Sequence, residues 1–269
     1  MSNSSGPLAE YEPRRFRSTV PYYSRFRLSY PAALIARVGA MAGLAPGDGV
    51  MDLGCGPGLL AIPFAEAGMR VVGVDPEPDM LAAARQAAEL ARVTIDFRQA
   101  SSFDLPTDIG LIHLVTMGRS FHWMDRTETL KILDRLLPPD GAIALFEDDH
   151  PRTAENRWLT VLGEVGQRYG SQEAAHRAAR QRTDYRSHVS FLFDSPFSHI
   201  ERVGVFIRHA ITTDDIVGRA FSLSMLSKEK LGERAADFER DLRAALTELS
   251  PEGRFTEIAE LAAVVAKRN

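Results

Sequence analysis

Three glycines alternate with other residues directly after a short apolar run that contains an acid. The run is Val50–Leu53, with Asp52 inside it, and Gly54, Gly56 and Gly58 follow before a helix-like segment. Glycine is needed where the backbone turns sharply or approaches a ligand closely, because it has no Cβ. A strand, a glycine turn and a helix in this order predict a nucleotide-binding site, since free N–H groups at a helix start face anionic or polar ligands.

The spacing of the glycines argues against two other nucleotide motifs. The dinucleotide fingerprint places its glycines one and then two residues apart, and residues 54–59 do not match it. A P-loop is excluded because no Gly-Lys-Ser/Thr follows. A nicotinamide-dependent oxidoreductase on a similar sheet is kept as an alternative, although an obvious Tyr-x-x-x-Lys catalytic pair is also missing.

A second acid follows the next predicted strand. Asp75 comes directly after Arg70–Val74. In nucleotide-binding folds an acid at this place accepts hydrogen bonds from the ribose hydroxyls. The alternative role, a helix N-cap, suits Asp79 better. We therefore expect Asp75 to bind a ribose.

These motifs together resemble a known family. Asp52–Gly58 followed by Val71–Asp75 resembles the class I S-adenosylmethionine-dependent methyltransferases, and Phe121–Asp125 (Phe-His-Trp-Met-Asp) is similar to the small-molecule branch that includes trans-aconitate methyltransferase-like enzymes. The resemblance covers residues 31–146. It implies an α/β fold: a Rossmann-like, seven-stranded, mostly parallel sheet with helices on both faces, an antiparallel final hairpin and a helical lid or cap.

The resemblance also implies a cofactor, S-adenosyl-L-methionine, with S-adenosyl-L-homocysteine as its product. Relatives usually place an Asp where this chain has Ser101, so here the adenine contact is expected from the neutral Ser101 or from backbone around Ser102. The expected cofactor-binding residues are Tyr22, Arg27, Asp52, Gly54, Cys55, Gly56, Gly58, Asp75, Pro76, Met80, Ser101, Ser102, Phe103, Met117, Gly118, Phe121 and His122.

The segment from Arg14 to Pro31 interleaves arginines with aromatic residues. One interpretation is a lid whose aromatic rings close over the ligand while a guanidinium pairs with a carboxylate. The resemblance supports this for Tyr22, Tyr23 and Arg27, with Tyr23 facing the substrate. The alternative is a surface segment with solvated arginines. Nucleic-acid binding is disfavoured, because the rest of the chain supplies no basic channel.

Candidate bases follow two predicted strands. His122 is the first candidate, because imidazole can remove a proton near neutral pH; the alternative is that His122 and Trp123 only wall the site, with Trp123 facing the substrate. Glu147 and His150 are rival bases, and a carboxylate acceptor needs none. No metal is expected, because Asp148, Asp149 and His150 are adjacent and point in different directions.

A polar insertion follows His150 and is basic in its second part. Arg177 and Arg180 share a helix face. One interpretation is that both arginines lie in solvent. The other is that the insertion forms a cap that recognises an anionic group of the substrate, in which case Arg180 and Tyr185 are the expected substrate-binding residues. The predicted division is residues 1–30 as tail and lid segment, 31–150 as cofactor-binding core, 151–195 as helical cap insertion, and 196–269 as the remaining strands and helices.

The composition argues against nucleic-acid-binding, disulfide-bonded and membrane-spanning classes of protein. The 269 residues are 45% apolar with a net charge of −4, which disfavours nucleic acid as a partner. Cys55 is the single cysteine, which suits a reducing cytoplasm. No apolar run is long enough for a membrane span. The partner is expected to be a small molecule, which can carry an acidic group, and the oligomeric state stays open.

The predicted reaction is transfer of the methyl group to this small molecule by in-line displacement, with the acceptor held between the carboxyl edge of the sheet and the lid. A non-catalytic cofactor-binding module is a further alternative. A protein or tRNA methyltransferase is weakened by the acidic balance and by the missing Asn-Pro-Pro-Tyr-like motif. Whether O, N, C or S accepts the methyl group is left open, because fold does not fix substrate.

Overall fold

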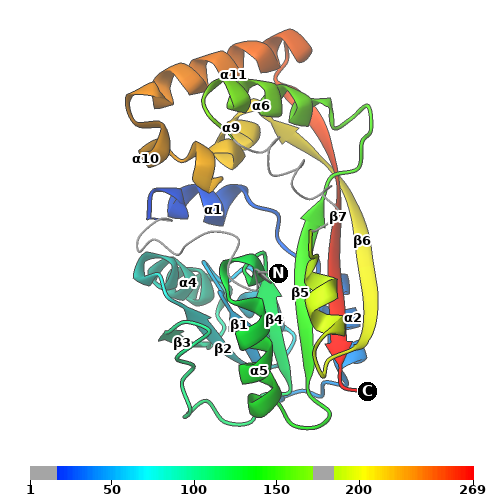
Figure 1. Cartoon of the computed structure of the whole chain (residues 1–269). Helices are drawn as coiled ribbons and strands as arrows, with labels where there is room; N and C mark the ends of the chain where they lie inside the picture. Colours follow the sequence, from blue (N-terminus) through cyan, green and yellow to red (C-terminus); the bar gives the residue numbers. More distant parts are fainter. Residues whose placement is uncertain (1–16, 172–184) are drawn as a thin grey trace.

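A single mixed sheet organises the chain. The computed structural model describes residues 17–171 and 185–269, and their seven strands lie in the order β3-β2-β1-β4-β5-β7-β6 (Figure 1). The first five strands run parallel, and β7 is antiparallel to both β5 and β6. This confirms the Rossmann-like sheet and its antiparallel final hairpin. The strands are β1 Gly49–Leu53, β2 Arg70–Asp75, β3 Asp96–Gln99, β4 Leu114–Gly118, β5 Ala142–Asp149, β6 His199–Thr212 and β7 Arg254–Lys267.

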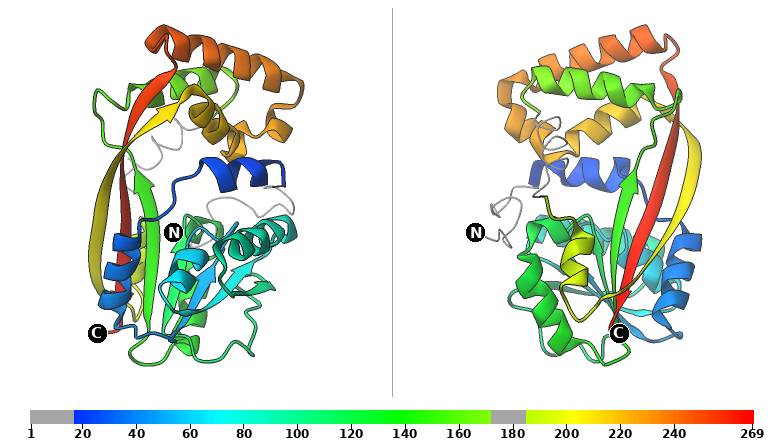
Figure 2. Two further views of the ribbon diagram at one scale, coloured as in Figure 1. Left: turned by 180° about the vertical axis from the view of Figure 1, so that it is seen from behind. Right: turned by 45° about the vertical axis from the view of Figure 1, so that its right-hand side comes forward.

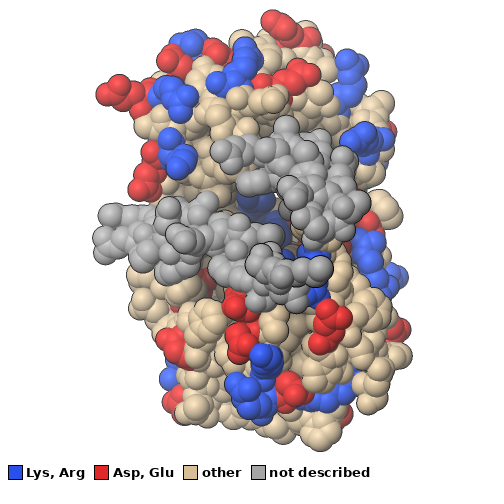
Figure 3. Space-filling view, viewed as in Figure 1, with Lys and Arg blue, Asp and Glu red and all other residues tan. Residues whose placement is uncertain are grey.

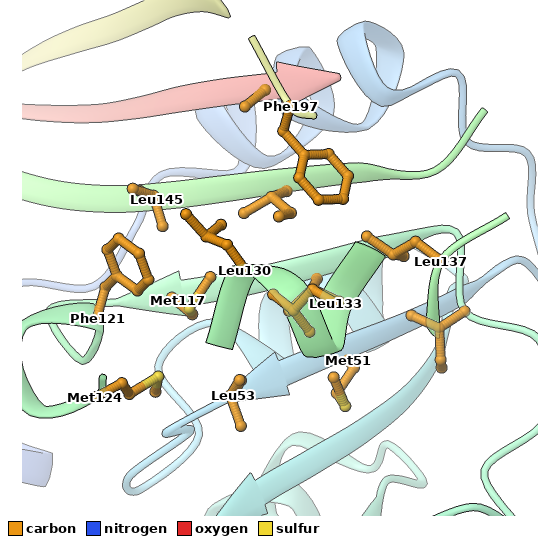
Figure 4. Packing of buried hydrophobic residues seen from close by; sticks show 14 of the residues in the cluster. Met51, Leu53, Met117, Phe121, Met124, Leu130, Leu133, Leu137, Leu145 and Phe197 are labelled. Carbon is orange, nitrogen blue, oxygen red and sulfur yellow. The ribbon is translucent and has the colours of Figure 1, made fainter. Parts of the chain in front are cut away.

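Helices cover both faces of the sheet because neighbouring residues of a strand point to opposite faces. Val50 packs with α2 and α3 on one face, and Met51 packs with α5 and α8 on the other; Figure 4 shows the second cluster. The helices are α1 Val20–Phe26, α2 Ala32–Ala42, α3 Ala61–Glu66, α4 Pro78–Ala91, α5 Arg126–Leu136, α6 Arg157–Arg168, α8 His188–Phe193, α9 Thr213–Phe221, α10 Lys228–Leu231 and α11 Ala235–Leu249.

Helices α6, α9, α10 and α11 form a third hydrophobic cluster, which we call the helical group. Its largest fully buried side chains are Trp158, Phe221 and Phe238. Figures 1 and 2 show this group beyond the carboxyl ends of the parallel strands, with α1 between it and the sheet. The group therefore combines part of the expected insertion 151–195 with helices from the C-terminal quarter of the chain.

Three elements differ from the sequence expectation. The sequence pattern predicts two separate strands at 197–203 and 205–210, but they form one strand, β6, because Gly204 stays in the ladder opposite Ala262. The amphipathic pattern over 228–249 predicts one helix, but this helix is interrupted at Gly232, whose φ is +57°. The third strand is predicted over 93–97, but β3 starts at Asp96. Among the helices of the described residues, none has the length and apolar character needed to cross a bilayer.

Candidate functional site

The glycine loop after β1 adopts a backbone that side chains disfavour. Gly54, Gly56 and Gly58 have φ values of 73°, 52° and 90°, in the left-handed region that suits glycine. At Gly54 a Cβ would also lie 2.5 Å from the Cβ of Ser120. The amides of Gly54 and Cys55 donate to Val74 O at 2.7 and 3.0 Å, which ties the loop to β2. The need for glycine at these positions is therefore steric.

Asp52 supports the loop from beneath. Its carboxylate accepts a hydrogen bond from Ala61 N at 3.1 Å and one from the Thr116 hydroxyl at 3.1 Å. The side chain also borders the cleft above the loop, but only 1% of the residue is exposed. Burial raises the pKa of Asp52 to about 7. This acid joins the start of α3 to β4.

Asp75 at the end of β2 contacts the glycine loop directly. Its two oxygens accept from Gly56 N at 2.8 Å and from Glu77 N at 2.9 Å. Burial raises its pKa to about 6. Each carboxylate oxygen keeps further acceptor capacity. The N-cap of α4 is Glu77, so the expectation that Asp79 caps this helix is wrong; Pro78 at the first helical position sets the start two residues earlier.

A cleft opens above the loop and is bordered by aromatic side chains and an arginine. Its lining is Tyr23, Tyr30, Asp52, Gly54, Cys55, Gly56, Pro57, Leu59, Leu60, Gly118 and Arg119. The loop, the end of β4 and α1 meet here, as the predicted cofactor site requires. Tyr23, expected to face the substrate, borders the cleft. Tyr22 instead packs against Phe221 at a ring distance of 5.3 Å, inside the helical group.

Arg119 is a cleft residue that the sequence reasoning missed. It is not a glycine but has a φ of 58°, and it donates to Asp148 at 3.0 Å and to Leu28 O at 3.1 Å. Burial alone would raise the pKa of Asp148, but the charges of Arg119 and Arg27 outweigh burial and hold that pKa below its usual value. An arginine directly after a buried strand was the signal available in the sequence.

Arg27 brings a second buried guanidinium to the same region. Its guanidinium lies 5.0 Å from the Tyr23 ring centre and donates to Ser222 O at 3.3 Å. Burial lowers its pKa. Within residues 17–171 and 185–269 it forms no ion pair with a carboxylate. A buried guanidinium in this state favours an anionic ligand group.

The loop after β3 contains a carboxylate close to Ser101, the neutral residue that was expected to contact the adenine. The Ser101 hydroxyl donates to Asp104, and Ser101 N donates to the same oxygen at 2.7 Å. These two bonds lower the pKa of Asp104. Asp104 therefore supplies a charge three residues after the position where relatives carry their Asp, and Phe103 beside it is exposed.

Aromatic and imidazole rings gather after β4. His122 lies 4.7 Å from Trp123 and 6.4 Å from His188, measured between ring centres. Arg126, which the sequence reasoning missed, is 2% exposed and lies 4.2 Å above the Phe191 ring. The expected pair His122 and Trp123 thus lies beside α8 and near the start of α5.

The rival bases Glu147 and His150 are separated. Glu147 pairs with Arg202 of β6 at 3.1 Å, and its side chain is 53% exposed. His150 instead lies under the helical group, where its Nε2 is 2.6 Å from Glu257. Glu257 has no exposed surface; burial would raise its pKa, but hydrogen bonds from His150 and Arg219 lower it to about 2. Neighbouring strand positions point to opposite faces, which accounts for the outward Glu147.

The remaining expected residues occupy varied places. Met80, Ser102, Met117 and Phe121 are buried, Pro76 and Tyr185 are partly exposed, and Arg180 lies outside the described residues. On the face shown in Figure 3, the coloured basic and acidic side chains are interspersed above and below the centre. That face carries no basic stripe among the residues it colours, which does not favour a nucleic-acid partner.

Comparison with known proteins adds a family match. The model of a methyltransferase domain family matches residues 50–141. An uncharacterized methyltransferase of Mycobacterium tuberculosis is 31% identical over 150 residues, covering 56% of this chain and 58% of that protein. A ubiquinone biosynthesis O-methyltransferase of Azorhizobium caulinodans is 43% identical over 116 residues, covering 42% of this chain and 45% of that protein. The chain thus spans about half the length of these relatives.

A solved structure resembles the whole chain. It is a methyltransferase of Thiobacillus denitrificans in complex with S-adenosyl-L-homocysteine, with a TM-score of 0.51 and 19% identity, and the match covers 95% of this chain and 99% of that one. At this identity the likeness concerns the fold. Residues 50–141 therefore match a methyltransferase domain family, and the chain shares the fold of this solved S-adenosylmethionine-dependent methyltransferase.

Proposed function

We propose that the protein transfers a methyl group from S-adenosyl-L-methionine to a small-molecule acceptor. The observation that carries this proposal is the glycine loop of the methyltransferase domain, held against Asp75 by the bond from Gly56 N. The loop, the carboxylate and the aromatic cleft occupy the carboxyl edge of the parallel strands, where ligands of open α/β sheets bind. The relative named as an O-methyltransferase of ubiquinone biosynthesis supports a small acceptor.

The residues present fit this cofactor. Asp75 would hold the ribose hydroxyls, and Asp104 would accept from the adenine amino group. Arg27 and Arg119, which line or adjoin the cleft with donors unspent at their Nε atoms, would hold the carboxylate of the amino-acid end. The glycine loop allows close approach of the ligand to its backbone, since a Cβ at Gly56 would meet open space.

A sulfonium methyl is already activated, so the main tasks of the protein are to orient the acceptor and to exclude water. Such orientation can lower a barrier by roughly 7–11 kcal/mol. In our proposal α1 and the helical group act as the lid, and Trp123 and Tyr185 face the acceptor. His122 and His150 are the proposed bases for a hydroxyl or amine acceptor; a carboxylate acceptor would need neither.

The proposal includes two narrower expectations, one on the acidic group of the acceptor and one on the cellular compartment. The resemblance to trans-aconitate methyltransferase-like enzymes favours an acceptor with an acidic group, and Arg126 adds a buried cation at the start of α5, where it lies over the Phe191 ring. Cys55 is buried with its thiol free, and burial raises its pKa well above the usual value. With a single cysteine the chain forms no internal disulfide, which supports a reducing compartment such as the cytoplasm.

Calorimetry with S-adenosyl-L-homocysteine tests the cofactor site. We expect Asp75→Asn to weaken binding at least about tenfold, because the ribose loses a charged acceptor. Asp79→Asn is the matched control, since Asp79 is a nearby acid in the first turn of α4, and it should bind like the wild type. A wild-type protein that does not bind this ligand would refute the proposal.

Turnover is tested separately. Release of S-adenosyl-L-homocysteine from S-adenosyl-L-methionine is measured with panels of small carboxylic acids and of phenols. A stimulated release identifies the acceptor class and supports an enzyme. Tight cofactor binding without release by either panel would favour the non-catalytic module instead.

A further inference from the structure

Helices α1 and α9 hold each other through two reciprocal arginine bonds. Arg219 of α9 donates its Nε–H to Phe26 O at the end of α1 over 3.2 Å. Arg27, directly after α1, donates to Ser222 O at the end of α9 over 3.3 Å. Gly218 lies beneath the Phe26 ring, so closely that an added Cβ would overlap the ring. The two helix ends are therefore fitted to one another in both polar and apolar contacts.

A buried carboxylate fixes α9 to the sheet. Glu257 of β7 has no exposed surface and accepts from both terminal nitrogens of Arg219, one of them at 2.8 Å. His150 of the β5 end and His209 of β6 contact the same carboxylate at 2.6 and 3.1 Å. A bidentate guanidinium–carboxylate pair has a defined geometry, and removing one partner leaves an uncompensated buried charge. Arg219 thus has one orientation relative to the sheet.

The same arginine therefore determines where α1 lies. Glu257 of β7 forms an ion pair with Arg219, and Arg219 in turn donates a hydrogen bond to Phe26 O at the end of α1. Helix α1 in turn carries Tyr23, which borders the cleft, and is followed by Arg27, whose guanidinium stacks on Tyr23. Figures 1 and 2 show α1 across the space between the sheet and the helical group.

We propose that the Arg219–Glu257 ion pair is a positioning element of the cofactor site, which fixes α1 so that Tyr23 and Arg27 are in place before the amino-acid end of the ligand arrives. Neither residue touches the ligand. This inference rests on the proposed function. A site formed in only a fraction of molecules binds more weakly by that fraction, so loosening α1 should weaken binding of any ligand group that α1 contacts.

Arg219→Lys is the first test. Lysine keeps the positive charge beside Glu257 but loses the planar donor set that reaches Glu257 and Phe26 O together. Binding is measured by calorimetry with two probes: S-adenosyl-L-homocysteine, and 5′-methylthioadenosine, which lacks the amino-acid end. We expect the affinity for the first probe to fall about tenfold or more and the affinity for the second to stay at the wild-type value.

Gly218→Ala is an independent variant that leaves the ion pair intact. Alanine suits the helical backbone of α9, but its Cβ must displace the Phe26 ring and with it α1. The same split between the two probes is expected. This variant carries the test if Arg219→Lys does not fold, which thermal unfolding of each protein will reveal.

Arg268→Lys is the matched control. Arg268 also pairs with a carboxylate, Asp134, and bonds to several carbonyls, but it ties the end of the chain to α5, away from α1. It should lose stability and keep both affinities. Unchanged affinities in both α9 variants, or equal losses for the two probes, would overturn the positioning role. A wild type that binds neither probe would instead refute the proposed function.

Discussion

Gly54 combines two constraints that no other residue type satisfies together. Its φ of 73° is disfavoured for side chains, and its Cβ position is occupied by Ser120. Asp75 shows a similar double requirement, because its carboxylate organises the loop through Gly56 N while keeping acceptor capacity for a ligand. At the scale of single residues, the site is thus specified by backbone geometry as much as by charge.

Gly54→Ala should separate these constraints when compared with Gly47→Ala. Gly47 also has a positive φ, of 90°, but its Cβ would meet open space. Both variants should lose about 1–3 kcal/mol of stability from backbone strain, and Gly54→Ala should lose more through overlap with Ser120, together with binding of S-adenosyl-L-homocysteine. Urea unfolding and calorimetry measure the two effects. Equal stability of the two variants with intact binding would contradict this account.

Helix α9 is short but connects the sheet, α1 and the helical group. Its first turn is held by a capping box, in which Asp215 N donates to the Thr212 hydroxyl at 3.2 Å and Thr212 N donates to Asp215 at 2.8 Å. Short helices depend on such end contacts and on packing, because few internal hydrogen bonds form. At the scale of elements, the placement of Arg219 therefore depends on the start of its helix.

Thr212→Ala should lower the free energy of unfolding by about 1 kcal/mol, because the N-cap acceptor is removed. Thr247→Ala in α11 is the control: its hydroxyl bonds back to Arg243 O within the helix, and alanine is the better helix former, so no loss is expected. Urea unfolding of both variants provides the measurement. A cost at Thr247 as large as that at Thr212 would show that the cap is not the cause.

At the scale of the whole molecule, buried acids whose pKa values are shifted in opposite directions determine how the free energy of unfolding depends on pH. Burial raises the pKa of Asp52 from 3.8 to about 7 and of Asp75 to about 6. The folded chain then binds these protons more tightly, so their contribution to stability falls as the pH rises from 3.8 through these values. Glu257 is opposite: its pKa is lowered from 4.5 to about 2, so its contribution is lost as the pH falls below 4.5.

We therefore expect the free energy of unfolding of the ligand-free protein to be highest near about pH 4 and to decrease on both sides of it. Asp52→Asn should flatten the decrease toward neutral pH, at about 1.4 kcal/mol per pKa unit removed. Glu257→Gln should flatten the acid side, although it is less stable at every pH because Arg219 loses its partner. Urea unfolding at constant ionic strength over this range checks both. A neutral limb unchanged in Asp52→Asn would contradict the assignment.

The sequence by itself determined the sheet and the position of the cofactor loop. Short apolar runs that alternate with helical periodicity, glycines at 54, 56 and 58 and an acid at 75 are local signals, because each depends on residues a few positions apart. The seven-stranded, mostly parallel sheet is confirmed. The mistaken boundaries lie in β6 and at Gly232, where a neighbouring strand or a single backbone angle decided the outcome.

Only the tertiary structure decided which charged groups meet. Glu257 and His150 are 107 positions apart, and Arg119 and Asp148 are 29 apart, yet both pairs are bonded. In the folded chain Glu147 also points outward and pairs with Arg202. Tyr22 packs in the helical group, while Tyr23 faces the cleft. The physical reason is that a buried charge is stabilised by a partner, and which partner it meets is decided by how strands and helices pack rather than by spacing along the chain.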